Sequence, residues 1–179
     1  MAALFEEEFD ASTLASGGHP FYVRKIDRRR HWRGDETMSV DDRVKTAATQ
    51  VFPSDNGKIS VFLVANAYDL IRVAIGLNSV GPSLNEKLEL LCITPDDLKH
   101  ACLQLEQSPG DTKCLHANSL HYDILDDRDA IDCLVRLLIS RDHKDRRLTK
   151  GKMKLAVEVA IKTGCHAIDS SACSCQCET

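Results

Sequence analysis

One apolar run limits the folds available to this chain more than any other feature. Residues 59–65, "ISVFLVA", are apolar at nearly every position, and the turn-forming sequence "FPSDNG" lies just before them. A strand with one solvent-exposed face would alternate between apolar and polar residues, whereas this run places apolar side chains on both faces. We therefore expect a central strand that is covered on both sides.

Helical periodicity follows this strand and then recurs along the chain. From Asn66 to about residue 77 the apolar positions follow a helical spacing, which stops at "NSVGPS". "KLELLCI" predicts another strand, after which Thr94 and Asp97 can form a capping box with Pro95 in the first helical position. The inner face expected for that helix comprises Leu98, Ala101, Cys102 and Leu105.

The remaining segments give less uniform signals. "PFYVRKI" predicts a short strand, and Ser39 with Asp42 can cap a helix whose buried face would begin at Val40. "DDRDAIDCLVRLLISR" and residues 149–163 predict two more helices. "QSPGDTK" is typical of a loop, and "CLHANSLHYDIL" of an extended stretch.

Strands and helices thus alternate through the middle of the chain, and helices dominate its end. This order favours an α/β fold with two or three layers, in a single small domain with a short, partly buried sheet flanked by four or five helices and a helix-rich C-terminal half. We expect a flexible acidic arm over residues 1–18, the α/β domain over 19–164 and a cysteine-rich tail over 165–179.

Composition excludes several classes of protein. The 179 residues are 43% hydrophobic and 28% charged, which is ordinary for a globular domain, and the net charge of -4 gives no general attraction to nucleic acid. The longest apolar run is interrupted by Asn66, Asp69 and Arg72, so no transmembrane segment is predicted. The acidic N-terminus does not resemble a secretory signal, so we expect a cytoplasmic protein with reduced thiols.

A basic stretch, "RKIDRRRHWR", is one candidate site for an anion or a partner. Its proposed contact residues are Arg28, Arg29, Arg30, Trp32 and Arg33. Cations beside an aromatic ring can hold phosphates and stack on a base, but a solvated loop neutralised by nearby acids has the same composition. The second basic run, "RDHKDRRLTKGKMK", is expected to be a charged connection between the last two helices.

A second candidate site is catalytic and contains His116, His121 and Asp123, with Cys114 nearby. On an extended chain, His121 and Asp123 share a face, and a His–carboxylate pair can act as a general base. His116 would point the other way unless the chain bends. The same residues also suit a polar edge strand and loop, and no catalytic motif accompanies them.

The C-terminal sequence "SACSCQCET" suggests a metal site. It contains Cys173, Cys175 and Cys177, and Cys165 and His166 lie just before it. These five side chains are soft ligands that could bind Zn²⁺ or Cu(I). The paired CxxC spacing of structural zinc sites is missing, and a disordered tail, a processed modified peptide or a lipidated end are the alternatives. Cys92, Cys102 and Cys133 fall on apolar faces and are expected in the core.

No motif in the chain identifies a family. Because the unusual composition lies outside the predicted core, the leading hypothesis is a non-enzymatic binding or accessory protein that contacts a protein partner, with no cofactor. The alternatives are a metal-binding protein using the tail cysteines, a small enzyme using a His/Asp pair, and a weak nucleic-acid binder using the basic stretches.

Overall fold

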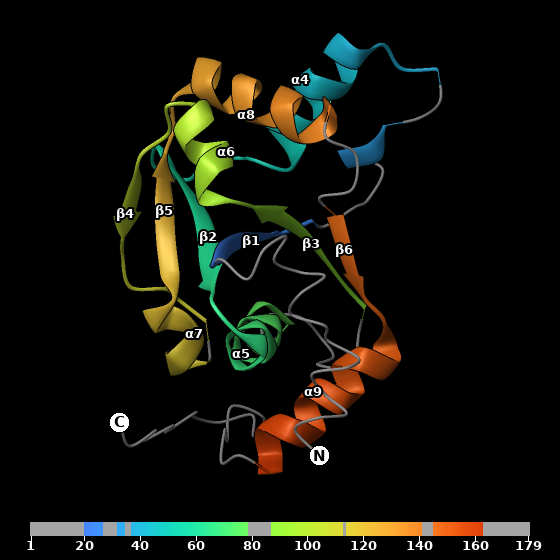
Figure 1. The fold of residues 1–179 in the computed structure, drawn as a ribbon, viewed down its shortest axis with the longest axis vertical. Helices are drawn as coiled ribbons and strands as arrows, with labels where there is room; N and C mark the ends of the chain where they lie inside the picture. Colours follow the sequence, from blue (N-terminus) through green and yellow to red (C-terminus); the bar gives the residue numbers. More distant parts are fainter. Residues whose placement is uncertain are drawn as a thin grey trace.

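Six strands form one sheet in the computed structural model of the protein, which describes residues 20–26, 32–34, 37–78, 87–112, 114–140 and 145–162. The strands are Phe21–Lys25 (β1), Lys58–Val64 (β2), Leu88–Ile93 (β3), Leu105–Gln107 (β4), His121–Leu125 (β5) and Asp145–Leu148 (β6). Their order is β4-β5-β2-β1-β3-β6, and each neighbouring pair is antiparallel (Figure 1). The prediction of a single small α/β domain is confirmed.

Helices cover both faces of this sheet (Figure 1). On one face lie α4 (Val40–Gln50), α6 (Pro95–His100) and α8 (Arg128–Ser140). On the other lie α5 (Ala67–Asn78), α7 (Leu115–Ser119) and α9 (Lys150–Lys162). A separate cluster of buried apolar side chains lies under each set of helices, so the domain has three layers.

The apolar run at β2 occupies the position predicted for it. β2 lies between β5 and β1, and its successive side chains point to opposite faces of the sheet. Ile59 and Val61 pack in the cluster under α4, α6 and α8, whereas Phe62 and Val64 pack in the cluster under α5, α7 and α9. The run is therefore apolar throughout because both of its faces are buried.

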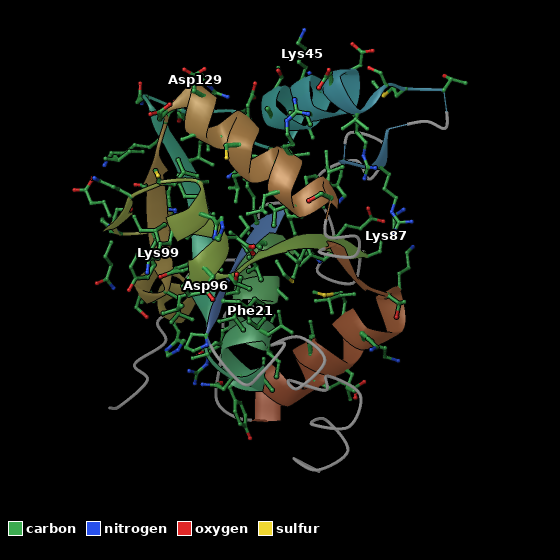
Figure 2. All side chains as sticks on the ribbon, turned by 45° about the horizontal axis from the view of Figure 1, so that its top comes forward. Phe21, Lys45, Lys87, Asp96, Lys99 and Asp129 are labelled. Carbon is green, nitrogen blue, oxygen red and sulfur yellow. The ribbon has the colours of Figure 1, made fainter. Side chains whose placement is uncertain are left out.

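Trp32 belongs to the core and not to the surface. It is 3% exposed and packs in the same cluster as the buried side chains of α4 and α8. The indole is therefore not available to stack on a bound molecule. By contrast, Figure 2 shows Lys45 and Asp129 at the outer surfaces of α4 and α8, while Phe21 lies inside, against α5.

Two arginines hold the C-terminal end of α4. Arg24 donates hydrogen bonds to the carbonyl oxygens of Val51 and Ser60, and Arg128 donates to that of Phe52 at 3.1 Å. The last carbonyls of a helix have no partner within it, so these guanidinium groups satisfy acceptors that would otherwise depend on water. They join β1 and α8 to the end of α4.

The helix predicted after Thr94 is shorter than expected. α6 ends at His100, and Cys102 then takes a left-handed backbone conformation with φ 57° that turns the chain out of the helix. The side chain of Cys102 is exposed, and Leu105 begins β4. The prediction that Cys102 lies in the core is wrong, because an isolated left-handed residue breaks the helical phase on which that prediction was based.

Four other sequence predictions need correction. Residues 114–125 are not one extended stretch, because α7 precedes β5, and the basic connection contains β6 at the edge of the sheet. Val40 is 58% exposed, since it is the first residue of α4 and lies before the turn that reaches the core. Cys133 is also exposed, because Ile131, Leu134 and Leu138 define the buried face of α8.

In the described part of the chain, no helix combines the length and apolar character that crossing a bilayer requires. The predicted acidic arm and cysteine-rich tail lie outside the described residues.

We predict that Thr94→Ala lowers the free energy of unfolding by about 1–2 kcal/mol. Thr94 accepts from the backbone N–H of Asp97 at 3.2 Å, and its hydroxyl donates to the fully buried Asp97 carboxylate at 2.7 Å. Urea unfolding measures the change. Ser39→Ala is the matched control at an exposed cap, where water can replace the lost bonds, and it should cost about 0.5 kcal/mol. Equal losses in both variants would contradict this account.

Candidate functional site

The candidate site lies where α5 and α7 pack together under the β2–β5 side of the sheet (Figure 1). Gly76 makes this packing possible: a Cβ atom at this position would lie 2.9 Å from the Cβ of Ala117 and 2.9 Å from the hydroxyl of Thr112. Both contacts are too short for real atoms. The glycine therefore lets the short helix α7 lie directly against α5.

Side-chain hydrogen bonds organise the start of α5. The Asn66 side chain accepts from the backbone N–H of Asp69 at 3.0 Å, and the Asp69 carboxylate accepts from the backbone N–H of Ala65 at 3.0 Å. These bonds satisfy N–H groups that lack partners at a helix start. They also hold the nearly buried Asp69 carboxylate with its other oxygen directed toward α7.

His116 on α7 lies against two charged residues of α5. Arg72 Nη1 donates to His116 Nε2 at 2.6 Å, and Asp69 Oδ1 lies 3.9 Å from the same nitrogen. Partial burial, followed by the neighbouring Arg72 charge, lowers the pKa of His116, and Asp69 opposes the shift. The imidazole is thus favoured in its neutral form, which is the form that can accept from Arg72.

Two large apolar side chains are exposed on the two helices that this contact joins. Tyr68 is 46% exposed and precedes Asp69 in α5, and Leu115 is 55% exposed and precedes His116 in α7. Each is a chain neighbour of one member of the Asp69–His116 pair. We call Tyr68, Arg72, Leu115 and His116 the α5–α7 face.

A second polar cluster connects β5 to the loop before α7. His121 and Asp123 are each 7% exposed, and their side chains share the sheet face of Phe62, which pairs with His121 across β2 and β5. Ser108 Oγ lies 2.6 Å from Asp123 Oδ2 and 2.9 Å from His121 Nδ1. The prediction that His121 and Asp123 point to the same face holds.

The donor and acceptor in each hydrogen bond decide what this cluster can do. His121 Nδ1 also lies 3.2 Å from the carbonyl oxygen of Ser108, and it donates to that acceptor in the tautomer that has its proton on Nδ1. The Ser108 hydroxyl donates to Asp123. In a catalytic relay the imidazole would instead take the proton from the hydroxyl. The arrangement fastens the loop to β5, with the Ser108 hydroxyl directed to Asp123.

Lys58 and Glu106 lie beside this cluster on β2 and β4. Lys58 Nζ is 3.1 Å from the Glu106 carboxylate and 3.7 Å from Asp123 Oδ2. The hydrogen bond to Glu106 and the charge of that carboxylate raise the pKa of Lys58, so its ammonium group stays protonated. The cluster thus ends in a solvent-facing ion pair at the sheet edge.

The structure separates the residues of the predicted catalytic site. His121 and Asp123 are together, His116 instead contacts α5, and Cys114 is fully buried at the start of α7. Of the predicted anion site, Trp32 is in the core and Arg33 is exposed.

The other predicted contacts lie outside the described residues. These are Arg28, Arg29, Arg30, Cys165, His166, Cys173, Cys175 and Cys177. Within the described ranges, His, Cys, Asp and Glu side chains form no group of three that could hold a metal ion.

Sequence reasoning missed Ser108, Arg72, Tyr68 and Leu115. The sequence places Ser108 in a loop, thirteen positions before His121. Ser108 becomes the partner of His121 only through the β4–β5 pairing, which no local pattern indicates. Tyr68 and Arg72 have a four-residue spacing that places them on one side of a helix, which is the one local signal that could have indicated a shared surface.

Comparison of the chain with protein-family models, with curated proteins and with solved structures finds no match.

We predict that the protein loses stability as pH falls below about 6.5, in part through His116. The unfolded imidazole takes up a proton near its ordinary pKa of 6.5, whereas the folded one does so only at lower pH. The unfolded state therefore binds more protons in this window, and the free energy of unfolding decreases. Urea unfolding at about pH 7.5 and about pH 5.5 measures the effect.

His116→Asn should reduce this pH dependence, whereas His100→Asn, which changes an exposed imidazole, should retain it. If the free energy of unfolding of His116→Asn changed with pH as it does in the unmodified protein, the Arg72–His116 contact would not control the pH dependence.

We predict that Ser108→Ala destabilises the protein by about 1–3 kcal/mol, because it leaves the buried Asp123 carboxylate without its hydroxyl donor. The double variant Ser108→Ala/Asp123→Ala should cost less than the sum of the two single changes. Ser119→Ala removes an exposed hydroxyl bond and should stay within about 0.5 kcal/mol of the unmodified protein. Additive losses would mean that Ser108 and Asp123 stabilise the fold independently.

Proposed function

We propose that this chain is a binding protein that holds a protein partner on the α5–α7 face. The observation that carries the proposal is the exposure of Tyr68 and Leu115, at 46% and 55%, on the two helices that the Arg72–His116 contact joins. Protein interfaces are enriched in aromatic residues and arginine, and their strongest contacts are tyrosine and arginine side chains near the centre of the patch. The α5–α7 face combines these types on two packed helices.

The other exposed apolar side chains do not share this setting. Val40 is 58% exposed at the first residue of α4, on the opposite side of the sheet, and Leu125 is 41% exposed at the end of β5. Single exposed apolar residues are normal on protein surfaces. What favours the α5–α7 face is therefore the combination of an exposed aromatic ring and an exposed leucine with a guanidinium group between the two helices.

The Ser108–His121–Asp123 cluster supports a binding function over a catalytic one. Its hydroxyl proton is donated to a carboxylate that also faces Lys58, and its imidazole Nδ1 lies against the hydroxyl and the carbonyl oxygen of Ser108. These polar groups are used to hold the loop that leads into α7. The cluster thus keeps α7 in place against α5, which a rigid binding surface requires.

We expect a displayed random-peptide library, selected on the immobilised full-length protein, to yield peptides that bind this face. Tyr68→Ser/Leu115→Ser should weaken these peptides by about tenfold or more, because both apolar anchors are lost. Fluorescence anisotropy with a labelled selected peptide measures the affinity.

The matched control is Val40→Ser/Leu125→Ser, which removes two exposed apolar side chains elsewhere on the surface and should leave the affinity unchanged. Selected peptides that are indifferent to Tyr68→Ser/Leu115→Ser, or the absence of any selected peptide, would refute binding at this face.

A further inference from the structure

Arg72 has hydrogen-bonding capacity that the described part of the fold does not use. A guanidinium group carries five N–H donors, and Nη1 of Arg72 donates to His116 Nε2. Among the described residues, this imidazole nitrogen is the acceptor that Arg72 contacts. No described residue accepts a hydrogen bond from Nε or Nη2, and the edge that these two atoms form matches the two oxygens of a carboxylate.

The charge of Arg72 is also not neutralised by an ion pair in the described part of the chain. Asp69, one turn earlier in α5, directs one oxygen to the backbone of Ala65 and the other toward His116. Arg72 is partly buried, so part of its solvation is already lost before a partner arrives. A partly desolvated cation without a counter-charge favours an anionic group on whatever covers it.

His116 keeps the guanidinium in one orientation. Its neutral Nε2 accepts from Nη1, and packing of α7 on α5 through Gly76 and Ala117 holds the imidazole in place. The groups facing His116 are Asp69 and Arg72 from α5, and Asp111 is an exposed acid in the preceding loop. Holding Nη1 reduces the rotational freedom that Arg72 would lose on binding.

We propose that the α5–α7 face binds an acidic protein segment, in which an aspartate or glutamate carboxylate is held by Nε and Nη2 of Arg72 while a neighbouring apolar side chain packs on Tyr68 and Leu115. This inference rests on the proposed function and specifies the chemistry of the partner. Arg72 is the specificity-determining residue, His116 is a positioning residue, and Tyr68 and Leu115 provide the apolar contact.

A double-mutant cycle tests the inference. Peptides selected on the full-length protein should carry Asp or Glu next to an aliphatic or aromatic residue. In a labelled selected peptide, replacing that acid by its amide should weaken binding about tenfold, and Arg72→Gln should do the same with the acidic peptide. The two changes together should cost little more than either one alone, because they remove the same contact.

Two further variants separate charge from geometry. Arg72→Lys keeps the charge but loses the bidentate donor edge, so its affinity should lie between those of Arg72→Gln and the unmodified protein. Arg136→Gln removes an exposed arginine that pairs with Asp41 on the other side of the sheet, and it should have no effect. Urea unfolding of each variant verifies that the fold persists.

The outcomes distinguish the two proposals. If selected peptides depend on Tyr68 and Leu115 but lack an acid, or if the cycle shows simple additivity, the carboxylate inference fails and the binding face stands. If no selected peptide depends on Tyr68 and Leu115, both fail.

Discussion

Two-sided burial of the central strands is the constraint on which the rest of this structure depends. β2 and β3 direct apolar side chains to both faces of the sheet, with Ile59 and Leu91 on one side and Phe62 and Leu90 on the other. Leaving either face in water would expose a large apolar surface, at a cost of about 25 cal/mol for each Å². Helices must therefore cover both faces. Successive helices alternate between them: α4, α6 and α8 lie on one face, and α5, α7 and α9 on the other.

The candidate site lies where hydrophobic packing between helices and sheet gives way to hydrogen bonds between polar side chains. At β5 the side chains on the sheet face of Phe62 are not only apolar but include His121 and Asp123, which form a hydrogen-bond network with Ser108. Buried polar groups need partners, and the network supplies them while fixing the loop that begins α7. α7 is only five residues long, so it cannot cover the surface as a longer helix would. Tyr68 on α5 and Leu115 on α7 stay exposed, and Arg72 and His116 join the two helices, so the proposed binding face results from this packing.

Local signals were sufficient for most of the secondary structure but for little of the site. The strands at β2 and β3 and the cap at Thr94 follow from neighbouring residues, because burial on both faces and capping both leave a short-range pattern. β4 and β6 left no such pattern: each is short and lies at an edge, where pairing with one neighbour supplies the stability. His121 and Asp123 were identified together because a strand places alternate residues on one face. Their partner Ser108, and the contact of His116 with Arg72, depend on which elements pack together.

The sequence by itself determined that this chain forms an α/β domain with a strand buried on both faces, because apolar periodicity is a local property of the chain. It also determined where α5 and α8 lie and which of their faces are buried, apart from an error at Cys133, which is exposed on α8. Only the tertiary structure decided that the sheet is antiparallel throughout, that Trp32 is in the core, and that Arg72 meets His116. Those outcomes depend on contacts between residues far apart in the chain, such as the 44 positions that separate Arg72 from His116, and no pattern within one segment encodes them.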